Sequence, residues 1–102
     1  LIFREVMIQA AKLIISGTVQ KVGYRNWFAV QAVELELKGY VQNLPTAPVE
    51  AVVVGDERKI QEMIIRSQKG LIYADLADIQ QLELNPAEYQ FENFQIKYSY
   101  ND

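Results

Sequence analysis

The 102-residue chain contains neither cysteine nor histidine. The absence of cysteine excludes disulfide bonds, thiolate chemistry and cysteine-based zinc sites. The absence of histidine removes the commonest general base and the commonest metal ligand in proteins. The usual nucleophiles and bases of enzymes are therefore mostly missing from this sequence.

Positive charge is also in short supply. Ten Lys and Arg residues stand against thirteen Asp and Glu residues, which gives a net charge of -3 at pH 7. A protein that binds the phosphate backbone of a nucleic acid needs a basic face, so we expect no nucleic-acid partner. This balance does not exclude a single positive pocket for a small anion.

Long hydrophobic runs are absent as well. The longest ones, such as AVVV at residues 51–54, are far too short to span a membrane. The N-terminal stretch LIFREVMIQ carries Arg4 and Glu5 and lacks the pattern of a signal peptide. We therefore expect a cytoplasmic monomer that does not bind membranes.

The composition is typical of a single globular domain. Half of the residues are hydrophobic and 23% are charged, and a chain of this length can bury one core unaided. No linker or low-complexity tract interrupts it. We predict an N-terminal extension over residues 1–10 and one domain over residues 11–100.

The first half of the chain predicts a strand followed by a helix. Alternating apolar residues predict a strand over 12–20, and Ile14 on its second face indicates that it is interior to a sheet. Helical spacing then predicts a helix over about 25–37, stopped by Gly39. The apolar positions of that helix are Phe28, Ala32 and Leu35.

Two short strands follow, over residues 39–44 and 49–55. The sequence PTAP separates them, and prolines so close together fit a turn and not the interior of a sheet. We expect the two strands to form a hairpin.

The second half predicts a helix and two further strands. Asp56 can cap a helix that ends at Gly70, with apolar positions at Ile60, Met63 and Ile64. Residues 73–84 predict a longer strand with a bulge near Asp78, where the alternation changes phase. The last strand covers 94–100 and places on one face Phe94, Ile96 and Tyr98.

The predicted order is β-α-β-β-α-β with a short additional strand at the C-terminus. This order is typical of the ferredoxin-like split βαβ sandwich, an α+β fold with two helices on one face of an antiparallel sheet.

The stretch QKVGYRNWF, at the start of the first predicted helix, is the candidate anion site. Residues 20–24 lead into the helix, where unpaired N–H groups and the positive end of the helix dipole attract anions. Gly23 permits a backbone conformation that a side chain would forbid. Arg25 adds a planar guanidinium, which suits phosphate or carboxylate. The alternative is a surface arginine whose stem lies over Trp27 or Tyr24.

Two motifs give this site a more specific interpretation. The sequence GTVQKVGYR at residues 17–25, then LELKGYVQN at 35–43, followed by PVE, resembles the acylphosphatase family in residues and in spacing. The resemblance extends over about residues 11–98 and agrees with the predicted element order. It implies an acylphosphatase-like domain over residues 11–100.

The resemblance also implies a reaction and the residues that perform it. Acylphosphatases split carboxyl–phosphate anhydrides into a carboxylate and phosphate, with no metal and no cofactor. Arg25 and Asn43 would be the catalytic residues, with Asn43 orienting the attacking water. The ligand would be a small acyl phosphate, or a phosphate or sulfate ion. The phosphate-binding loop would comprise Gln20, Lys21, Val22, Gly23, Tyr24 and Arg25.

The sequence departs from the family pattern at several positions. Lys21 occupies a position that is usually glycine, within the loop that would hold the phosphate. Leu44 and Pro48, in the turn after Asn43, supply no hydroxyl groups to support that residue. Glu36 replaces a glycine at the end of the first helix, which we expect to affect stability only. These departures predict reduced activity.

Other interpretations remain open at this stage. The chain could be a weak or inactive anion-binding or interaction module, or the acylphosphatase-like domain of a larger protein that uses carbamoyl phosphate. An RNA-recognition domain has the same element order, but the third strand, VEAVVV, lacks the aromatic residues such a domain needs. The acidic residues are scattered without metal-ligand spacing, so we expect them to be solvated.

The aromatic residues near this site are expected to pack in the core. Trp27 and Phe28 are placed to pack against Tyr24 at the start of the helix. The sequence does not show whether Tyr98 and Tyr100 lie near the site.

Overall fold

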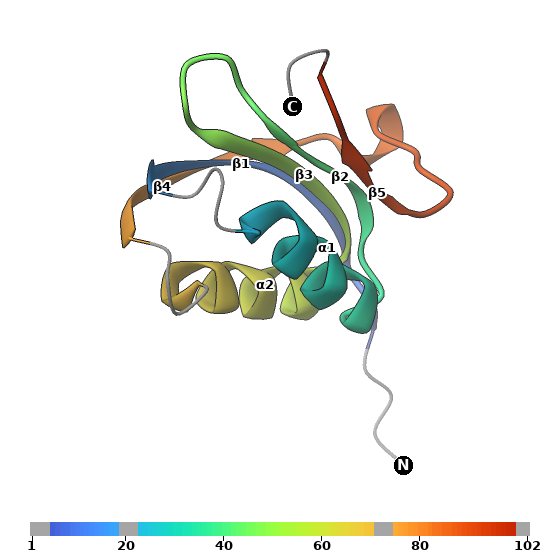
Figure 1. The fold of residues 1–102 in the computed structure, drawn as a ribbon. Coiled ribbons are helices and arrows are strands. Elements are labelled where there is room, and N and C mark those ends of the chain that lie inside the picture. The colour runs from blue at the N-terminus through green and yellow to red at the C-terminus, as the bar shows by residue number, and fades with distance from the viewer. Residues whose placement is uncertain (1–4, 19–22, 71–74, 100–102) are drawn as a thin grey trace.

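The computed structural model describes residues 5–18, 23–70 and 75–99 (Figure 1). The elements follow the predicted order. They are β1 (Ile8–Thr18), α1 (Tyr24–Glu34), β2 (Lys38–Asn43), β3 (Val49–Asp56), α2 (Glu57–Lys69), β4 (Asp75–Leu84), a 3-10 turn (Pro86–Glu88) and β5 (Phe94–Lys97).

The strands form one sheet in the order β4-β1-β3-β2-β5, and both helices lie against the same face of it (Figure 1). The pairs β1–β4, β1–β3 and β2–β3 are antiparallel, as predicted for this ferredoxin-like sandwich. The short β5 differs, since it pairs with β2 in parallel. The reason is topological: the chain passes from β4 at one edge of the sheet to the opposite edge before β5 begins.

The core lies between the helices and the sheet. On the strands, every second residue faces the helices, although Val52 of β3, on the opposite face, is buried as well. The residues that build this core include Leu13, Ile15, Val41, Ala51, Val53, Phe28, Ala32, Ile60 and Met63.

β1 begins earlier than the predicted strand over 12–20. Its main chain pairs with β3 from Ile8 onward, opposite Asp56. The pattern of the sequence does not reveal this start, because the side chain of Ile8 is exposed and Ala10 and Ala11 are both buried. Residues 19 and 20 lie outside the described part of the chain.

The end of α1 corrects the prediction that Gly39 stops this helix. The helix ends at Glu34, and the chain reverses at Glu36, which has φ 60°. Gly39 already belongs to β2, with φ 134°, and a side chain there would collide with the carbonyl of Val52 in β3. This glycine therefore permits two strands to approach closely, and it does not terminate a helix.

The limits of α2 agree with the prediction. Asp56 is its N-cap and accepts a hydrogen bond at Oδ1 from the main-chain N of Arg58, over 3.0 Å. Gly70 follows the last turn with φ 63°. The predicted hairpin of β2 and β3 is also confirmed.

The predicted bulge in β4 is confirmed by the strand register. Ser16 of β1 lies opposite Asp78, but the next residue, Gly17, lies opposite Leu76. One residue of β4 therefore has no partner residue in β1, as in a β-bulge. The predicted start of this strand, residues 73 and 74, lies outside the described residues.

In the described ranges, no helix is both long enough and apolar enough to cross a membrane.

Candidate active site at the start of helix α1

The N-terminus of α1 has no counter-charge of its own. Gly23 precedes the helix with φ 80° and ψ 17°, and its carbonyl accepts a hydrogen bond from Trp27 N at 3.1 Å. Its N-cap residue, Gly23, has no side chain to cap this end, and no acidic residue lies in the first turn. The helix dipole therefore presents positive potential here. The predicted loop residues Gln20, Lys21 and Val22 lie outside the described residues.

Aromatic packing fixes the start of α1 against the core. The ring of Tyr24 lies 5.3 Å from the ring of Trp27 and 6.2 Å from that of Phe28, between centroids, which confirms the predicted packing. The hydroxyl of Tyr24 donates a buried hydrogen bond of 3.2 Å to the carbonyl of Ser67 in α2. Burial raises the pKa of Tyr24 to about 12, because the charged form loses its hydration.

Arg25 is the second residue of α1 and is half-buried. Its Nη1 is withdrawn from solvent. The guanidinium carbon lies 4.8 Å from the centre of the Tyr98 ring, within the range of a cation–π contact. The guanidinium is thus directed to the C-terminal end of β5.

Asn43 is the last residue of β2, opposite Val49 of β3. Its Oδ1 is also withdrawn from solvent. The turn that follows is closed by a main-chain hydrogen bond of 2.8 Å from Leu44 N to the carbonyl of Pro48, and Ala47 within it has φ 87°. Leu44 and Pro48 therefore shape this turn through main-chain groups. That they support Asn43 less firmly stays a prediction.

The topology brings Arg25 and Asn43 to one edge of the sheet. Helix α1 packs against both β2 and β5. These strands run in parallel, with Gln42 opposite Lys97, so their next residues, Asn43 and Tyr98, lie at the same end. Since Arg25 lies over Tyr98, the guanidinium and the Asn43 amide share this end of the molecule.

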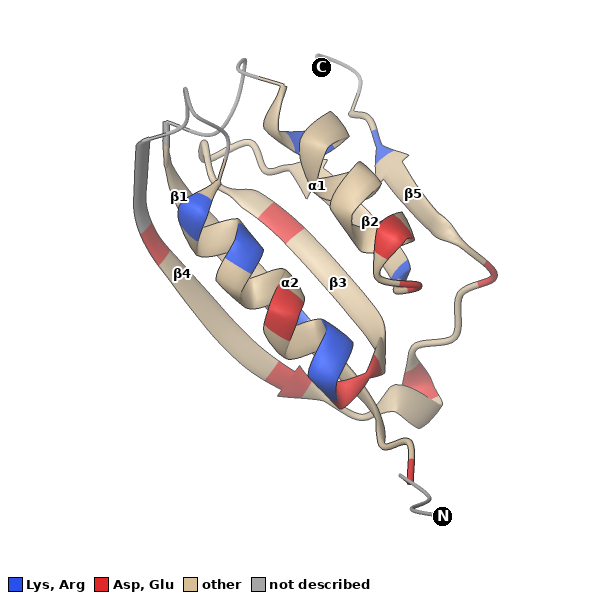
Figure 2. Cartoon of the chain, turned by 90° about the horizontal axis from the view of Figure 1, so that it is seen from below, with Lys and Arg blue, Asp and Glu red and all other residues tan. Residues whose placement is uncertain are grey.

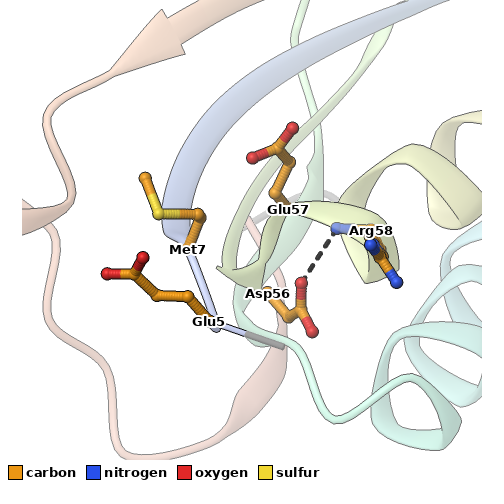
Figure 3. A pocket seen from close by; sticks show the side chains of 5 residues that line it. All are labelled: Glu5, Met7, Asp56, Glu57 and Arg58. Carbon is orange, nitrogen blue, oxygen red and sulfur yellow. Dashed lines mark hydrogen bonds between the residues drawn. The ribbon is translucent and has the colours of Figure 1, made fainter. Parts of the chain in front are cut away.

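The N-terminus of α2 offers the opposite electrostatic environment. A hollow of about 160 Å³ lies beside it, lined by Glu5, Met7, Asp56, Glu57 and Arg58 (Figure 3). Three carboxylates and a single guanidinium line this hollow, and a phosphate would be repelled there. Seen from the helix side, α1 carries little charge, whereas α2 carries charges of both signs (Figure 2). Of the two helix starts, that of α1 is the one suited to an anion.

Several of the scattered acidic residues have contacts other than a metal. Glu34 forms an ion pair of 3.0 Å with Arg66, and Glu36 lies 4.0 Å from Lys59. Asp56 caps α2. Within residues 5–18, 23–70 and 75–99, no three His, Cys, Asp or Glu side chains gather as metal ligands would.

Tyr98 is the residue near this site that the sequence did not place. It follows β5 and is 65% exposed, with its ring beside Arg25. Its alternation with Phe94 and Ile96 indicated the face of the sheet, but the parallel partner of β5 was needed to locate it. Tyr100 lies outside the described residues.

Comparison with known proteins agrees with this architecture. The acylphosphatase family model matches residues 11–96. An acylphosphatase of Methanocella arvoryzae is 37% identical over 83 residues, which are 81% of this chain and 94% of that protein. The crystal structure of an acylphosphatase from Bacillus subtilis matches with a TM-score of 0.84 and 28% identity, over 90% of this chain and all of that one.

The same fold also occurs within a larger protein. The crystal structure of HypF from T. kodakarensis matches with a TM-score of 0.79 and 34% identity, over 89% of this chain but 12% of that chain. By the extent of the family match and the identity to relatives of similar length, this chain belongs to the acylphosphatase family of hydrolases.

Proposed function

We propose that this protein hydrolyses acyl phosphates to a carboxylate and inorganic phosphate, with Arg25 holding the phosphate and Asn43 orienting the water. The observation that carries this proposal is the placement of both side chains at one edge of the sheet, beside the uncapped start of α1. A guanidinium, a side-chain amide and a positive helix end are the groups present there.

The phosphate is bound by complementary charge. The guanidinium of Arg25 suits two phosphate oxygens at once, because its N–H groups form a rigid fork within one plane. The main-chain N–H groups in the first turn of α1, from Tyr24 onward, add further donors at the positive end of the helix. An arginine in the first turn of a helix opposes the helix dipole when the site is empty. A bound anion between the two removes that conflict.

The water is oriented by the Asn43 amide. Its oxygen accepts a hydrogen bond from the water, but an amide is a very poor base. A non-bridging oxygen of the substrate phosphate therefore accepts the proton. The water oxygen forms a bond to phosphorus, the bond between phosphorus and the acyl oxygen breaks, and the acyl group leaves as a carboxylate.

This chemistry is compatible with a chain that has neither histidine nor cysteine. An acyl phosphate already contains a good leaving group, so neither a nucleophilic side chain nor a strong general acid is required. Catalysis depends on positioning and on stabilising charge on the phosphoryl oxygens.

A second candidate function is favoured by the departures at Lys21, Leu44 and Pro48. In that case the fold binds phosphate-like anions but turns over slowly or not at all. Loose support around a positioned residue is a recognised cause of a slow site. Affinity for phosphate and turnover therefore have to be measured separately.

The test is release of phosphate from benzoyl phosphate without added metal, with inorganic phosphate as a competitive inhibitor. We expect Arg25→Lys, which keeps the charge but loses the planar fork, to raise both KM and the inhibition constant for phosphate. Asn43→Ala should lower kcat by about 100-fold or more, with phosphate inhibition unchanged. Asn93→Ala, which changes an exposed asparagine outside the site, is the control for substitution of an asparagine.

The outcomes separate the two candidates. A wild-type rate equal to the uncatalysed rate, together with binding of phosphate in a calorimetric titration, establishes the binding module and rejects the hydrolase. Loss of turnover in Asn93→Ala as large as in Asn43→Ala rejects the assignment of the water to Asn43.

A further inference from the structure

Two cation–π contacts lie at the end of β5, one on each face of the sheet. On the face without helices, Nζ of Lys97 lies 3.8 Å from the centre of the Tyr40 ring. On the helix-covered face, the adjacent residue, Tyr98, provides the ring on which the guanidinium of Arg25 lies at 4.8 Å. The end of β5 thus places a cation, Lys97, against a ring on one face of the sheet, and a ring, Tyr98, against a cation on the other.

The contact between Lys97 and Tyr40 belongs to a polar network on the face opposite the site. The hydroxyl of Tyr40 and the side-chain amide of Gln42 each donate a hydrogen bond of 2.8 Å to Oε1 of Glu50. Lys12 lies 4.0 Å from the other oxygen of that carboxylate. This network holds β2 and β3 together on the open face, and we expect Lys97 to support strand docking there.

We propose that Tyr98 is a positioning residue for Arg25: its ring is the platform that orients the guanidinium toward the phosphate. This inference rests on the proposed role of Arg25. A ring that engages one face of the guanidinium leaves the N–H groups at its edge available to an anion. Ordering a long side chain costs conformational entropy, so a contact that is already formed reduces the ordering that an anion has to cause on binding.

The location of Tyr98 supports a local role. Its side chain is 65% exposed, so the ring is not needed to fill the core. It directly follows Lys97, and the partner of Lys97, Gln42, directly precedes Asn43, so Tyr98 and Asn43 lie at the same end of this strand pair. One residue therefore gives Arg25 a fixed place at the edge where Asn43 also lies.

The test compares three variants by calorimetric titration with inorganic phosphate and by the KM for benzoyl phosphate. Tyr98→Leu removes the ring, Tyr98→Phe keeps it, and Lys97→Met removes only the contact on the opposite face. We expect Tyr98→Leu to weaken phosphate binding and raise KM about two- to fivefold, the range of a cation–π contact at an exposed site. Tyr98→Phe should restore wild-type values, and Lys97→Met should leave them unchanged.

A double-mutant cycle separates positioning from general support. In an Arg25→Ala background, Tyr98→Leu should have no further effect on phosphate affinity, because the group that it orients is gone. If Tyr98→Leu disrupts the fold, replacing Tyr98 with fluorinated phenylalanines of the same shape weakens the ring's attraction for cations stepwise. Phosphate affinity should then fall in the same order.

Three results overturn the proposal: wild-type affinity and KM in Tyr98→Leu, an equal loss in Lys97→Met, or an unchanged Tyr98→Leu effect without Arg25. The proposed hydrolysis fails independently. A wild-type protein that binds phosphate with the expected dependence on Tyr98 but releases none from benzoyl phosphate keeps the platform and loses the reaction. A wild-type protein with normal turnover whose Tyr98→Leu variant has unchanged affinity and KM keeps the reaction and loses the platform.

Discussion

The two helices of this fold begin and end in opposite ways. Helix α2 follows the rules for a stable helix, with a capping aspartate, Glu57 in its first turn, basic residues in its last turn and Gly70 at its end. Helix α1 has no side-chain cap and no acid in its first turn, and it ends without a basic residue. Both helices pack on the same sheet, so burial does not explain the difference (Figure 2).

The difference lies in what surrounds an arginine at the same helical position. Arg25 and Arg58 are each the second residue of their helix. The charge of Arg58 is offset by Asp56 and Glu57, whereas the first turn of α1 contains no acidic residue. A helix that breaks the local rules at one end, in a fold that elsewhere follows them, indicates a site selected for binding.

The largest effect should come from comparing two single substitutions, Arg25→Ala and Arg58→Ala. Arg25→Ala is expected to lower kcat/KM for benzoyl phosphate by about 100- to 1000-fold, as for loss of a single charge-stabilising donor. Arg58→Ala should leave it unchanged, since that side chain lies at the acidic start of α2. Steady-state kinetics of both variants measure the contrast. Equal losses in the two would mean that net charge matters and that the position does not.

A smaller effect concerns a buried hydrogen bond that joins the start of α1 to α2. Tyr24→Phe removes the bond to the Ser67 carbonyl and should lower the unfolding free energy by about 0.5–1.5 kcal/mol at neutral pH. Urea unfolding of both proteins measures this. A variant as stable as the wild type would show that this bond contributes nothing to anchoring α1.

The same residue predicts a pH dependence. Its pKa is about 12 in the folded state against an ordinary 10.0, so the folded state binds more protons in this interval. This contribution to stability is fully present below pH 10 and is lost as the pH rises to about 12. Tyr40, whose pKa burial and Glu50 also raise to about 12, acts in the same direction. The difference between the wild-type and Tyr24→Phe curves isolates Tyr24, and parallel curves would contradict the assignment.

The smallest effect tests the other end of α1. Glu36 has φ 60°, nearly the value that Gly70 has after α2, and this conformation is unfavourable for a residue with a side chain. Glu36→Gly should therefore raise the unfolding free energy by about 0.5–1 kcal/mol without changing kcat/KM. Glu36→Ala removes the carboxylate near Lys59 but keeps the unfavourable backbone, and we expect no gain from it. Equal stability of the two variants would show that the unfavourable backbone conformation at Glu36 is not what lowers stability.

Local patterns in the sequence predicted most of the fold. The capping aspartate and Gly70 of α2 and the phase change near Asp78 are each read from a few neighbouring residues, and each is confirmed. Gly39 was misread because a glycine near a helix end usually stops it. Its role instead depends on Val52, which is distant in sequence.

The sequence also predicted part of the candidate site. Arg25 and Asn43 stand out because two motifs are in register, and their placement together follows from the element order. Tyr98 could not be assigned, because nothing within β5 reveals that it runs parallel to β2 and next to it. Non-local pairing of this kind has no signature in a short window of sequence.

The parallel pairing of β5 with β2 also bears on how the molecule folds. The site is assembled from the beginning, the middle and the final strand of the described chain, and its strand contacts join residues far apart in sequence. Folds dominated by such long-range contacts close their loops late and fold slowly. During synthesis, Arg25 and Asn43 leave the ribosome long before Tyr98. A nascent chain can therefore carry both catalytic candidates while still lacking the strand that leads into Tyr98.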